Sequence, residues 1–371
     1  MWCMTIHDPL YHRVAESIRE QIISGKLKYG ERLPSQKELT LQYHVSLITV
    51  KRALLELVKD GLLHGQPGRG VFVGAAAHSV APAKSARSES IGVIITDLTS
   101  PFYSSVLRAV ELEAAKHNCF VVFSNTDHTV PNEAQQIERL KSLPVRGFIV
   151  ASRQNNRMLQ PHIEALYKEA MPLVFVSYAH DKRINYIGTD HRMGGYLVAE
   201  HLVNLGYKKI AYVTPDVDNP LSIARYRGFV DGLSENGLSS EKAQVISVKN
   251  DGALNRFESG YKIGKKIVQN KKLPQAIFAF SDLTALGLKR AFLENGIRIP
   301  QDIALVGFDD IPMASQSIIP LTTIRQPMDQ IGRLAFDTLR RKVDGDRSVT
   351  RISLMPQLIV RHSCGAKLKE S

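Results

Sequence analysis

From Ile91 onward, short apolar runs alternate with amphipathic helical segments, and this pattern occurs twice. Such alternation is typical of parallel sheets covered by helices. Two consecutive sets predict two α/β lobes, each built on a doubly wound parallel sheet. The expected strands are 91–95, 120–123, 148–150 and 173–176, then 210–213, 245–248, 277–280 and 303–306; the expected helices are 102–117, 137–143 and 163–170, then segments near 194–205, 224–236, 257–270 and 284–295.

Polar side chains follow strand after strand in this part of the chain. Because ligands bind beyond the carboxyl ends of parallel strands, we expect one site there. Its carboxylates, amides and hydroxyls can bind the hydroxyls of a sugar, and Phe102 or Tyr103 can stack on the sugar ring. At each single position a helix cap is the alternative, but the repetition favours a site. The candidates are Asp97, Asn125, Asp127, Ser152, Arg153, Ser177, Tyr178, Asp190, Ser281, Asp282, Asp309 and Asp310.

The first 76 residues predict three short helices and a hairpin. Apolar residues recur every four positions until Gly25 ends the first helix. Ser35 and Glu38 form a capping box for a second helix, and Ser46 caps a third that ends at Gly61. Two apolar runs around a glycine-rich turn then predict a hairpin. The inward-facing residues are Leu10, Val14, Ile18 and Ile22 in the first helix and Val50, Leu54 and Leu57 in the third.

Three helices and a hairpin within about 75 residues can form a winged helix-turn-helix, whose second motif helix enters the major groove of DNA. A small helical interaction domain is the alternative. In the DNA-binding interpretation, Thr49, Lys51 and Arg52 reach phosphates or base edges, and Leu47 touches a thymine methyl. Arg69, at the tip of the turn, reaches a minor groove or a phosphate.

The segment also carries a set of motifs in a fixed order: Pro9-Leu10-Tyr11, Ser24-Gly25-Lys26-Leu27, Leu33-Pro34-Ser35, Val45-Ser46, Thr49-Val50-Lys51 and Gly68-Arg69-Gly70-Val71-Phe72-Val73. With these motifs it closely resembles the DNA-binding domain of the GntR family. The resemblance implies that Lys37, Thr49, Lys51 and Arg69 contact the operator. One departure is clear, because Leu47 stands where that family usually has arginine.

The later part of the chain carries a second ordered set of motifs: Pro101-Phe102-Tyr103, Val198-Ala199-Glu200-His201-Leu202, Gly206-Tyr207-Lys208-Lys209-Ile210, Arg225-Tyr226-Arg227-Gly228-Phe229, Ser281-Asp282, Val306-Gly307-Phe308-Asp309-Asp310 and Leu321-Thr322-Thr323-Ile324. From about 91 to 361 it resembles the effector domain of LacI/GalR repressors, itself similar to periplasmic sugar-binding proteins. The resemblance implies an effector held between the lobes. Arg225 and Asp309 would bind its hydroxyls; the matching aromatic and acidic positions are Phe102, Asp190 and Asp282, and Ser281 replaces a common asparagine.

These patterns predict a winged helix-turn-helix over 1–76, a linker over 77–90 and an effector-binding domain over 91–365. We expect one lobe to comprise about 91–188 and 319–349, and the other about 189–318 and 350–365. A GntR-type head on a LacI-type body resembles the arabinose repressors, which makes a pentose such as L-arabinose the first expectation for the effector. Repression of carbohydrate-utilisation genes, relieved by the sugar, is the expected function, and a sugar-responsive activator is the alternative.

Two other classes of function are disfavoured. Motifs of nucleotide-binding, hydrolase and zinc-protease sites are missing, so we expect no enzyme, no cofactor and no metal. A solute-binding protein is opposed by the DNA-binding head and by the start of the chain, which lacks the pattern of a secretion signal. The odd number of cysteines, three, suggests free thiols in the cytoplasm.

The formal net charge of +12 suits an operator DNA partner, although residues 1–76 carry only ten basic against seven acidic residues. We expect a homodimer that binds two operator half-sites, with no membrane contact.

Overall fold

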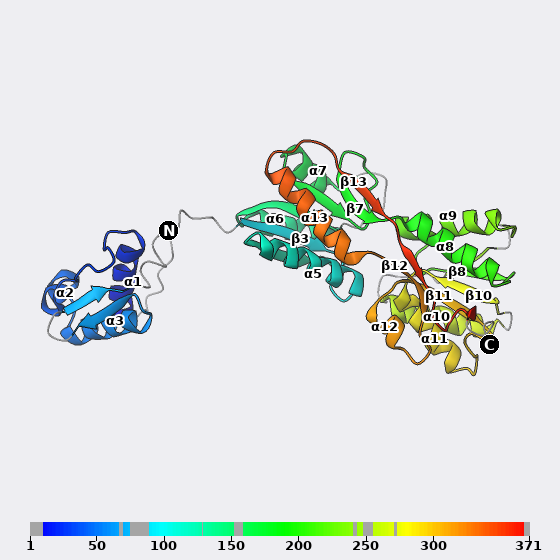
Figure 1. Cartoon of the computed structure of the whole chain (residues 1–371), viewed down its shortest axis with the longest axis horizontal. Helices are drawn as coiled ribbons and strands as arrows, with labels where there is room; N and C mark the ends of the chain where they lie inside the picture. Colours follow the sequence, from blue (N-terminus) through cyan, green and yellow to red (C-terminus); the bar gives the residue numbers. More distant parts are fainter. Residues whose placement is uncertain are drawn as a thin grey trace. The chain divides into compact units, whose positions relative to one another are not determined.

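The computed structural model describes residues 10–66, 70–74, 89–127, 129–151, 159–239, 243–247, 255–270 and 273–366. The chain divides into two compact units, Met1–Ser88 and Glu89–Ser371 (Figure 1). The expected linker over 77–90 falls mostly outside the described residues. Its last two residues, however, already belong to a strand that begins at Glu89. All residues of this strand after Glu89 are buried, so the strand is two residues longer than the apolar run 91–95 that predicted it.

The first unit has the three helices and the hairpin that the sequence predicted. They are α1 (Leu10–Ile23), α2 (Gln36–Tyr43), α3 (Leu47–Lys59), β1 (Leu63–Gln66) and β2 (Gly70–Val73), with β1 and β2 antiparallel. The capping box of Ser35 and Glu38 and the cap at Ser46 are both confirmed. Leu10, which we expected on the inner face of the first helix, is exposed (56%) at the start of α1. The remaining inner-face residues meet in one apolar core, which includes Val14, Ile18, Leu39, Val50, Leu54, Leu57, Leu63 and Val73.

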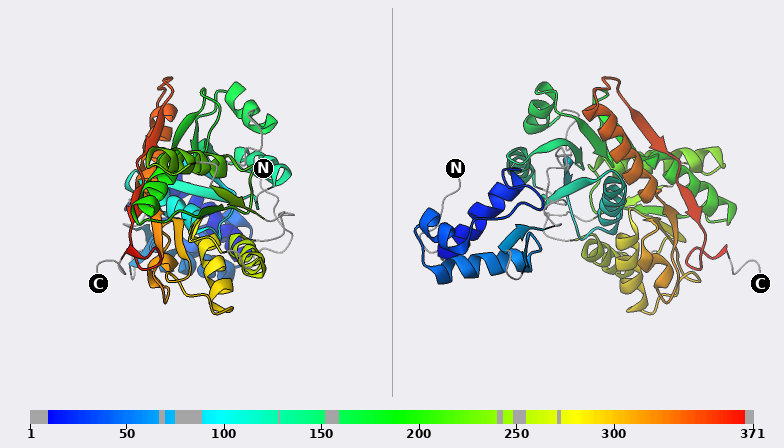
Figure 2. Two further views of the ribbon diagram at one scale, coloured as in Figure 1. Left: turned by 90° about the vertical axis from the view of Figure 1, so that its right-hand side faces the viewer. Right: turned by 60° about the vertical axis from the view of Figure 1, so that its left-hand side comes forward.

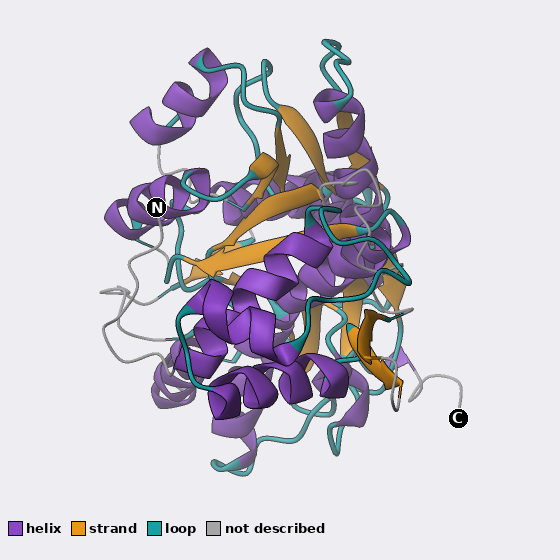
Figure 3. Cartoon of the chain, turned by 90° about the vertical axis from the view of Figure 1, so that its left-hand side faces the viewer, coloured by secondary structure: helices purple, strands orange, loops and turns teal. Residues whose placement is uncertain are grey.

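The second unit contains two six-stranded sheets, ordered β13-β7-β6-β5-β3-β4 and β14-β12-β11-β10-β8-β9. Each of the eight expected strands overlaps one of the observed strands. Helices lie on both faces of the sheets (Figures 2 and 3). The strands are β3 (Glu89–Ile95), β4 (Cys119–Asn125), β5 (Val145–Val150), β6 (Leu173–Val176), β7 (Asn185–Thr189), β8 (Ile210–Val213), β9 (Gln244–Ile246), β10 (Ala276–Ala279), β11 (Ala304–Asp309), β12 (Thr322–Arg325), β13 (Arg351–Leu354) and β14 (Gln357–Ile359).

The helices of the second unit cover these sheets and bury apolar side chains against both faces. In the first sheet, separate core clusters form around Val93 and Ile149 on one face and around Ile94 and Phe148 on the other. The second sheet is covered in the same way. The helices are α5 (Pro101–Lys116), α6 (Val130–Lys141), α7 (Pro161–Lys168), α8 (His191–Asn204), α9 (Pro220–Glu235), α10 (Arg256–Gln269), α11 (Asp282–Leu293), α12 (Pro312–Gln316) and α13 (Met328–Val343).

The lobe boundaries near the end of the chain were predicted wrongly. We expected 319–349 in the first lobe and 350–365 in the second. Instead, β12 pairs in parallel with β11 in the second sheet, and β13 pairs in parallel with β7 in the first. The expected division holds for α13, which packs on α5 in the first lobe, and for β14 (Gln357–Ile359), which pairs with β12 in the second sheet. A short apolar strand does not specify which of two sheets it joins, so its partner depends on which sheet edge the rest of the chain leaves open.

The chain therefore passes between the two lobes after β7, after β12 and after β13 within the described residues. These crossings bring the ends of β7 and β12 together, where the Thr189 hydroxyl donates a hydrogen bond to Gln326 (2.7 Å). None of the helices in these described segments has the length and apolar character of a membrane span.

Candidate nucleic-acid interface and ligand site

The start of α3 presents both polar and apolar side chains to solvent. Ser46 accepts a hydrogen bond from the Thr49 amide (3.2 Å) and pairs with the Thr49 hydroxyl (2.8 Å), which fixes the first turn. Lys51 is exposed, as are Leu47 (46%) and Ile48 (79%). Two adjacent exposed aliphatic side chains have no core to fill, but they can contact thymine methyl groups in a major groove.

The other predicted DNA-contacting residues lie on neighbouring elements or have another partner. Lys37 is exposed in the first turn of α2. The Arg52 guanidinium lies 4.1 Å from the centre of the Tyr11 ring, so this arginine is partly engaged within the unit. Arg69 falls outside the described residues. Sequence analysis missed Ile48, although its place between Leu47 and Thr49 at the helix start could have indicated it.

A second group of polar residues gathers where β7, β10 and β11 end. Asp190 caps α8 and accepts a hydrogen bond from the Met193 amide (2.9 Å). Asp282 begins α11 and is completely buried; its carboxylate accepts hydrogen bonds from the Thr323 hydroxyl (2.5 Å) and the Ile311 amide (2.9 Å). Burial, followed by the Asp309 charge, raises the pKa of Asp282. Both oxygens of Asp282 are thus engaged, and this residue braces the site rather than facing a ligand.

Arg225 is the central cation of this site, and only 2% of it is exposed. From α9 it donates to the Phe280 carbonyl and, at 3.3 Å, to Nδ1 of His191. Its guanidinium lies 3.6 Å from the centre of the Phe308 ring, and its Nη2 lies 3.8 Å from Oδ1 of Asp309. A buried arginine needs such partners, because an unpaired buried charge is very costly.

Asp309 adopts a strained backbone conformation at the end of β11, with φ +125°, and Asp310 follows with φ +58°. Asp310 is held by Arg325 and Arg361, each at 2.6 Å. Gln326 donates to Oδ1 of Asp309 (2.7 Å), while no described residue donates a hydrogen bond to Oδ2. Strained residues of this kind concentrate at ligand sites, and Oδ2 can accept a hydrogen bond from a ligand hydroxyl.

Three residues of this group were missed by sequence analysis. His191 follows Asp190 directly, Gln326 follows β12, and Arg256 is the first residue of α10. The Arg256 guanidinium lies 4.6 Å from the centre of the Phe280 ring. The strand 322–325 was not predicted, so its polar end was not searched, and after strand 185–189 only Asp190 was considered. Asn255 caps α10, and a cap residue at this position could have indicated from the sequence that a helix begins at Arg256.

The candidates from the first lobe lie differently. Phe102 is buried in the core, and Tyr103 is half-buried with its ring packed edge-on against Phe102 at 5.1 Å. Asp127 is exposed and accepts a hydrogen bond from the Asn125 amide group (2.6 Å). Tyr103 and Asp127 can therefore reach a ligand, whereas Phe102 supports the fold. Ser152 and Arg153 lie outside the described residues.

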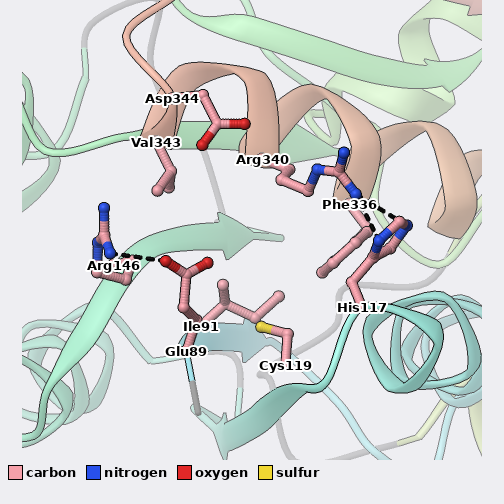
Figure 4. Close-up of a pocket in the computed structure, with 9 residues that line it drawn as sticks. All are labelled: Glu89, Ile91, His117, Cys119, Arg146, Phe336, Arg340, Val343 and Asp344. Carbon is pink, nitrogen blue, oxygen red and sulfur yellow. Dashed lines mark hydrogen bonds and ion pairs between the residues drawn. The ribbon is translucent and has the colours of Figure 1, made fainter. Parts of the chain in front are cut away.

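A separate cavity of about 270 Å³ opens at the amino ends of β3, β4 and β5 (Figure 4). Arg146 pairs with Glu89 at 2.7 Å, and Arg340 donates to His117. His117 also lies near Glu113 and Asp337, with ligand-type atoms within 4.8 Å of one another. Sequence analysis found no such cluster, because α13 brings Asp337 from far along the chain. The remaining lining residues are Ile91, Cys119, Phe336, Val343 and Asp344.

Comparison with known proteins divides the chain in the same way. Residues 10–73 match the gntR family of bacterial regulatory proteins, and residues 199–364 match a periplasmic binding protein-like domain. An arabinose metabolism transcriptional repressor of Geobacillus stearothermophilus is 27% identical over 366 residues, which is 96% of this chain and 97% of the relative. A transcriptional repressor PurR of Haemophilus influenzae (strain PittEE) is 28% identical over 281 residues, 74% of this chain and 81% of the relative.

The solved structure of a LacI family transcriptional regulator from Enterococcus faecium with bound ribose is also similar. It is 26% identical with a TM-score of 0.65, over 74% of this chain and 98% of that one.

Proposed function

We propose that this chain, which joins a domain of the gntR family of bacterial regulatory proteins to a periplasmic binding protein-like domain, is a DNA-binding transcription regulator controlled by a small sugar-like effector. The similarity to arabinose metabolism repressors across both domains, over 96% of this chain, carries the proposal. Operator binding in the absence of effector and release in its presence would make the chain a repressor of carbohydrate-utilisation genes.

The DNA-binding part of the proposal rests on α3. Its exposed start would enter a major groove, where Lys51 and Lys37 neutralise phosphates and Leu47 contacts a thymine methyl. The Thr49 hydroxyl already shares a hydrogen bond with the Ser46 hydroxyl, and it can accept or donate one further hydrogen bond. Arg52 and Arg69 complete the proposed contacts. We take residues 1–76 as the DNA-binding domain and residues 91–365 as the effector-binding domain.

The effector part of the proposal rests on Arg225 and Asp309. Asp309 would accept hydrogen bonds from ligand hydroxyls, and Arg225 would donate to ligand oxygens. Tyr103 would pack against the ligand, since its side chain is only partly buried. Phe102, Asp190 and Asp282 would support this site, and Asp127, Ser152 and Arg153 would contribute from the first lobe. Arabinose stands in the names of two similar repressors, so L-arabinose is the first neutral sugar to test.

Regulation would follow from linkage between the two domains. An effector can change operator affinity only by the difference in its affinity for two states of the protein, and such couplings typically amount to ~1–3 kcal/mol. We propose a cytoplasmic homodimer whose two heads bind a near-palindromic operator. A lobe rearrangement on effector binding would change the spacing of the heads.

Operator release by the effector is the decisive experiment. Operators selected from random DNA would be bound by the full-length protein, and sugars would be screened for release. Arg225→Ala and Asp309→Ala should bind the operator normally and lose the response. Arg227→Ala, which removes an exposed arginine of the same helix, should behave like the wild type. Failure to select any DNA sequence would reject the regulator, and a normal response by both site variants would reject the assigned site.

A further inference from the structure

Two arginine guanidiniums share one aromatic ring in the proposed effector site. Arg225 lies 4.5 Å from the centre of the Phe280 ring, and Arg256 lies 4.6 Å from the same centre. We propose that they hold an anionic group of the effector, so that the ligand is a sugar acid or a sugar phosphate rather than a neutral sugar. This inference rests on the proposed function and specifies its ligand class.

The balance of charge supports an anionic ligand. Asp309 is the carboxylate nearest to Arg225, at 3.8 Å, and burial raises the pKa of Asp309. No carboxylate of the described residues forms an ion pair with Arg256. Since Asp282 is fully buried and its pKa is raised, it does not offset the second arginine. The Phe280 ring contributes only a small attraction for each cation, so the pair of guanidiniums leaves positive charge for a ligand to match.

The hydrogen-bonding groups lead to the same conclusion. Burial and the Arg225 charge lower the pKa of His191 well below its usual range, so the ring is neutral. Its Nδ1 accepts a hydrogen bond from Arg225, which places the proton on Nε2. The Ser177 carbonyl acts on this ring, but the buried Nε2 forms no hydrogen bond of ordinary geometry with a described residue. Arg256 adds five more N–H donors.

The site is therefore rich in donors, and Oδ2 of Asp309 is its main open acceptor. A neutral pentose carries hydroxyls, each of which donates as well as accepts, and it brings no charge. A carboxylate or phosphate group only accepts hydrogen bonds, and it pairs with arginine in a two-point geometry. Hydroxyls of the same ligand would then donate to Asp309. A polyhydroxylated anion thus satisfies both parts of the site.

The test compares matched ligands on the full-length protein. Calorimetry would measure binding of L-arabinose, L-arabinonate and L-arabinose 5-phosphate, together with the corresponding D-glucose, D-gluconate and D-glucose 6-phosphate series. We expect at least one acid or phosphate to bind about tenfold or more tightly than its neutral sugar, as charged hydrogen bonds allow. Preference for the carboxylates over the phosphates, or the reverse, would identify the anionic group.

Three variants connect this preference to the residue. Arg256→Gln should lose the preference for the anion, and Arg256→Lys should retain part of it. Arg290→Gln is the control, because Arg290 also lies over an aromatic ring, 5.3 Å from the centre of Tyr261, but is exposed on α11. Melting temperatures of the unliganded variants would check folding.

Tighter binding of the neutral sugars, an unchanged preference in Arg256→Gln, or binding of no member of either series would overturn the anionic ligand. If the protein binds its operator and a neutral sugar releases it, the proposed function as a regulator holds and only the anionic ligand is rejected. Loss of all sequence-specific DNA binding would instead count against the proposed function.

Discussion

Replacing Gly195 with alanine tests the packing that positions Arg225. An added Cβ at Gly195 would lie 2.0 Å from the carbonyl oxygen of Arg225 and 2.9 Å from the amide nitrogen of Phe229. Gly228 makes the reciprocal approach, because a Cβ there would lie 1.7 Å from the carbonyl oxygen of Arg192. Helices α8 and α9 are therefore in backbone contact, and this contact holds the arginine against Asp309.

The size of the effect follows from these distances. Contacting carbon and oxygen atoms ordinarily lie about 3.5 Å apart, so α9 would have to retreat by roughly 1.5 Å. Overpacking of this kind costs about 1–3 kcal/mol. Glycine to alanine in an unobstructed helix has the opposite sign and stabilises by about 1 kcal/mol. A net loss of stability in Gly195→Ala would therefore show that the clash occurs. Displacement of α9 would also move the Arg225 guanidinium away from Asp309, from which it lies 3.8 Å in the wild type.

The assay combines thermal unfolding with operator release. We expect Gly195→Ala to melt several degrees lower, since about 1 kcal/mol lowers Tm by roughly 2–4 °C in domains of ~150–250 residues. It should bind the operator yet respond weakly to the effector. Ile223→Ala, at an exposed position of α9, is the control. A variant that is more stable than the wild type, with a normal response, would refute the backbone contact between the helices.

Three further predictions address DNA binding and pH dependence. Lys51→Ala should weaken operator binding and reduce the dependence of log Kd on log salt by about one unit, while Lys59→Ala at the far end of α3 should not; equal slopes would remove Lys51 from the interface. Leu47→Arg should shift the selected half-site toward guanine at one position, with ~1–3 kcal/mol of discrimination, and an unchanged selected sequence would contradict the placement of α3. Because burial raises the pKa of Asp282, the folded state holds its proton to higher pH than the unfolded state, and stability falls as pH rises through that pKa. Asp282→Asn should show a smaller fall between about pH 5 and 8 in chemical denaturation, and an identical profile would show that Asp282 is ionised throughout.

Much of the architecture could be predicted because it depends on local patterns. The four-residue spacing of Val14, Ile18 and Ile22 specifies a buried helix face, and Ser35 and Glu38 cap their helix through neighbouring atoms only. Apolar runs of strand length likewise located eight strands of the two lobes. The candidate site was predicted in part, since Asp309 follows a predicted strand and Arg225 stands in a motif that resembles the effector domain of LacI/GalR repressors.

The residues that were missed depend on contacts between distant segments. Gln326 reaches Asp309 only because β12 joins the second sheet, and Asp282 is occupied by Thr323 from that same strand. Arg256 and Arg225 come together only because α9 and α10 each bring an arginine to the Phe280 ring, just after β10. The sequence by itself determined the helices, most strands, the DNA-binding head and the two-lobed body, because periodicity and caps act within a few residues. Only the tertiary structure decided which sheet the last strands join and which charges share a site, because these depend on pairing and packing between segments far apart in the chain.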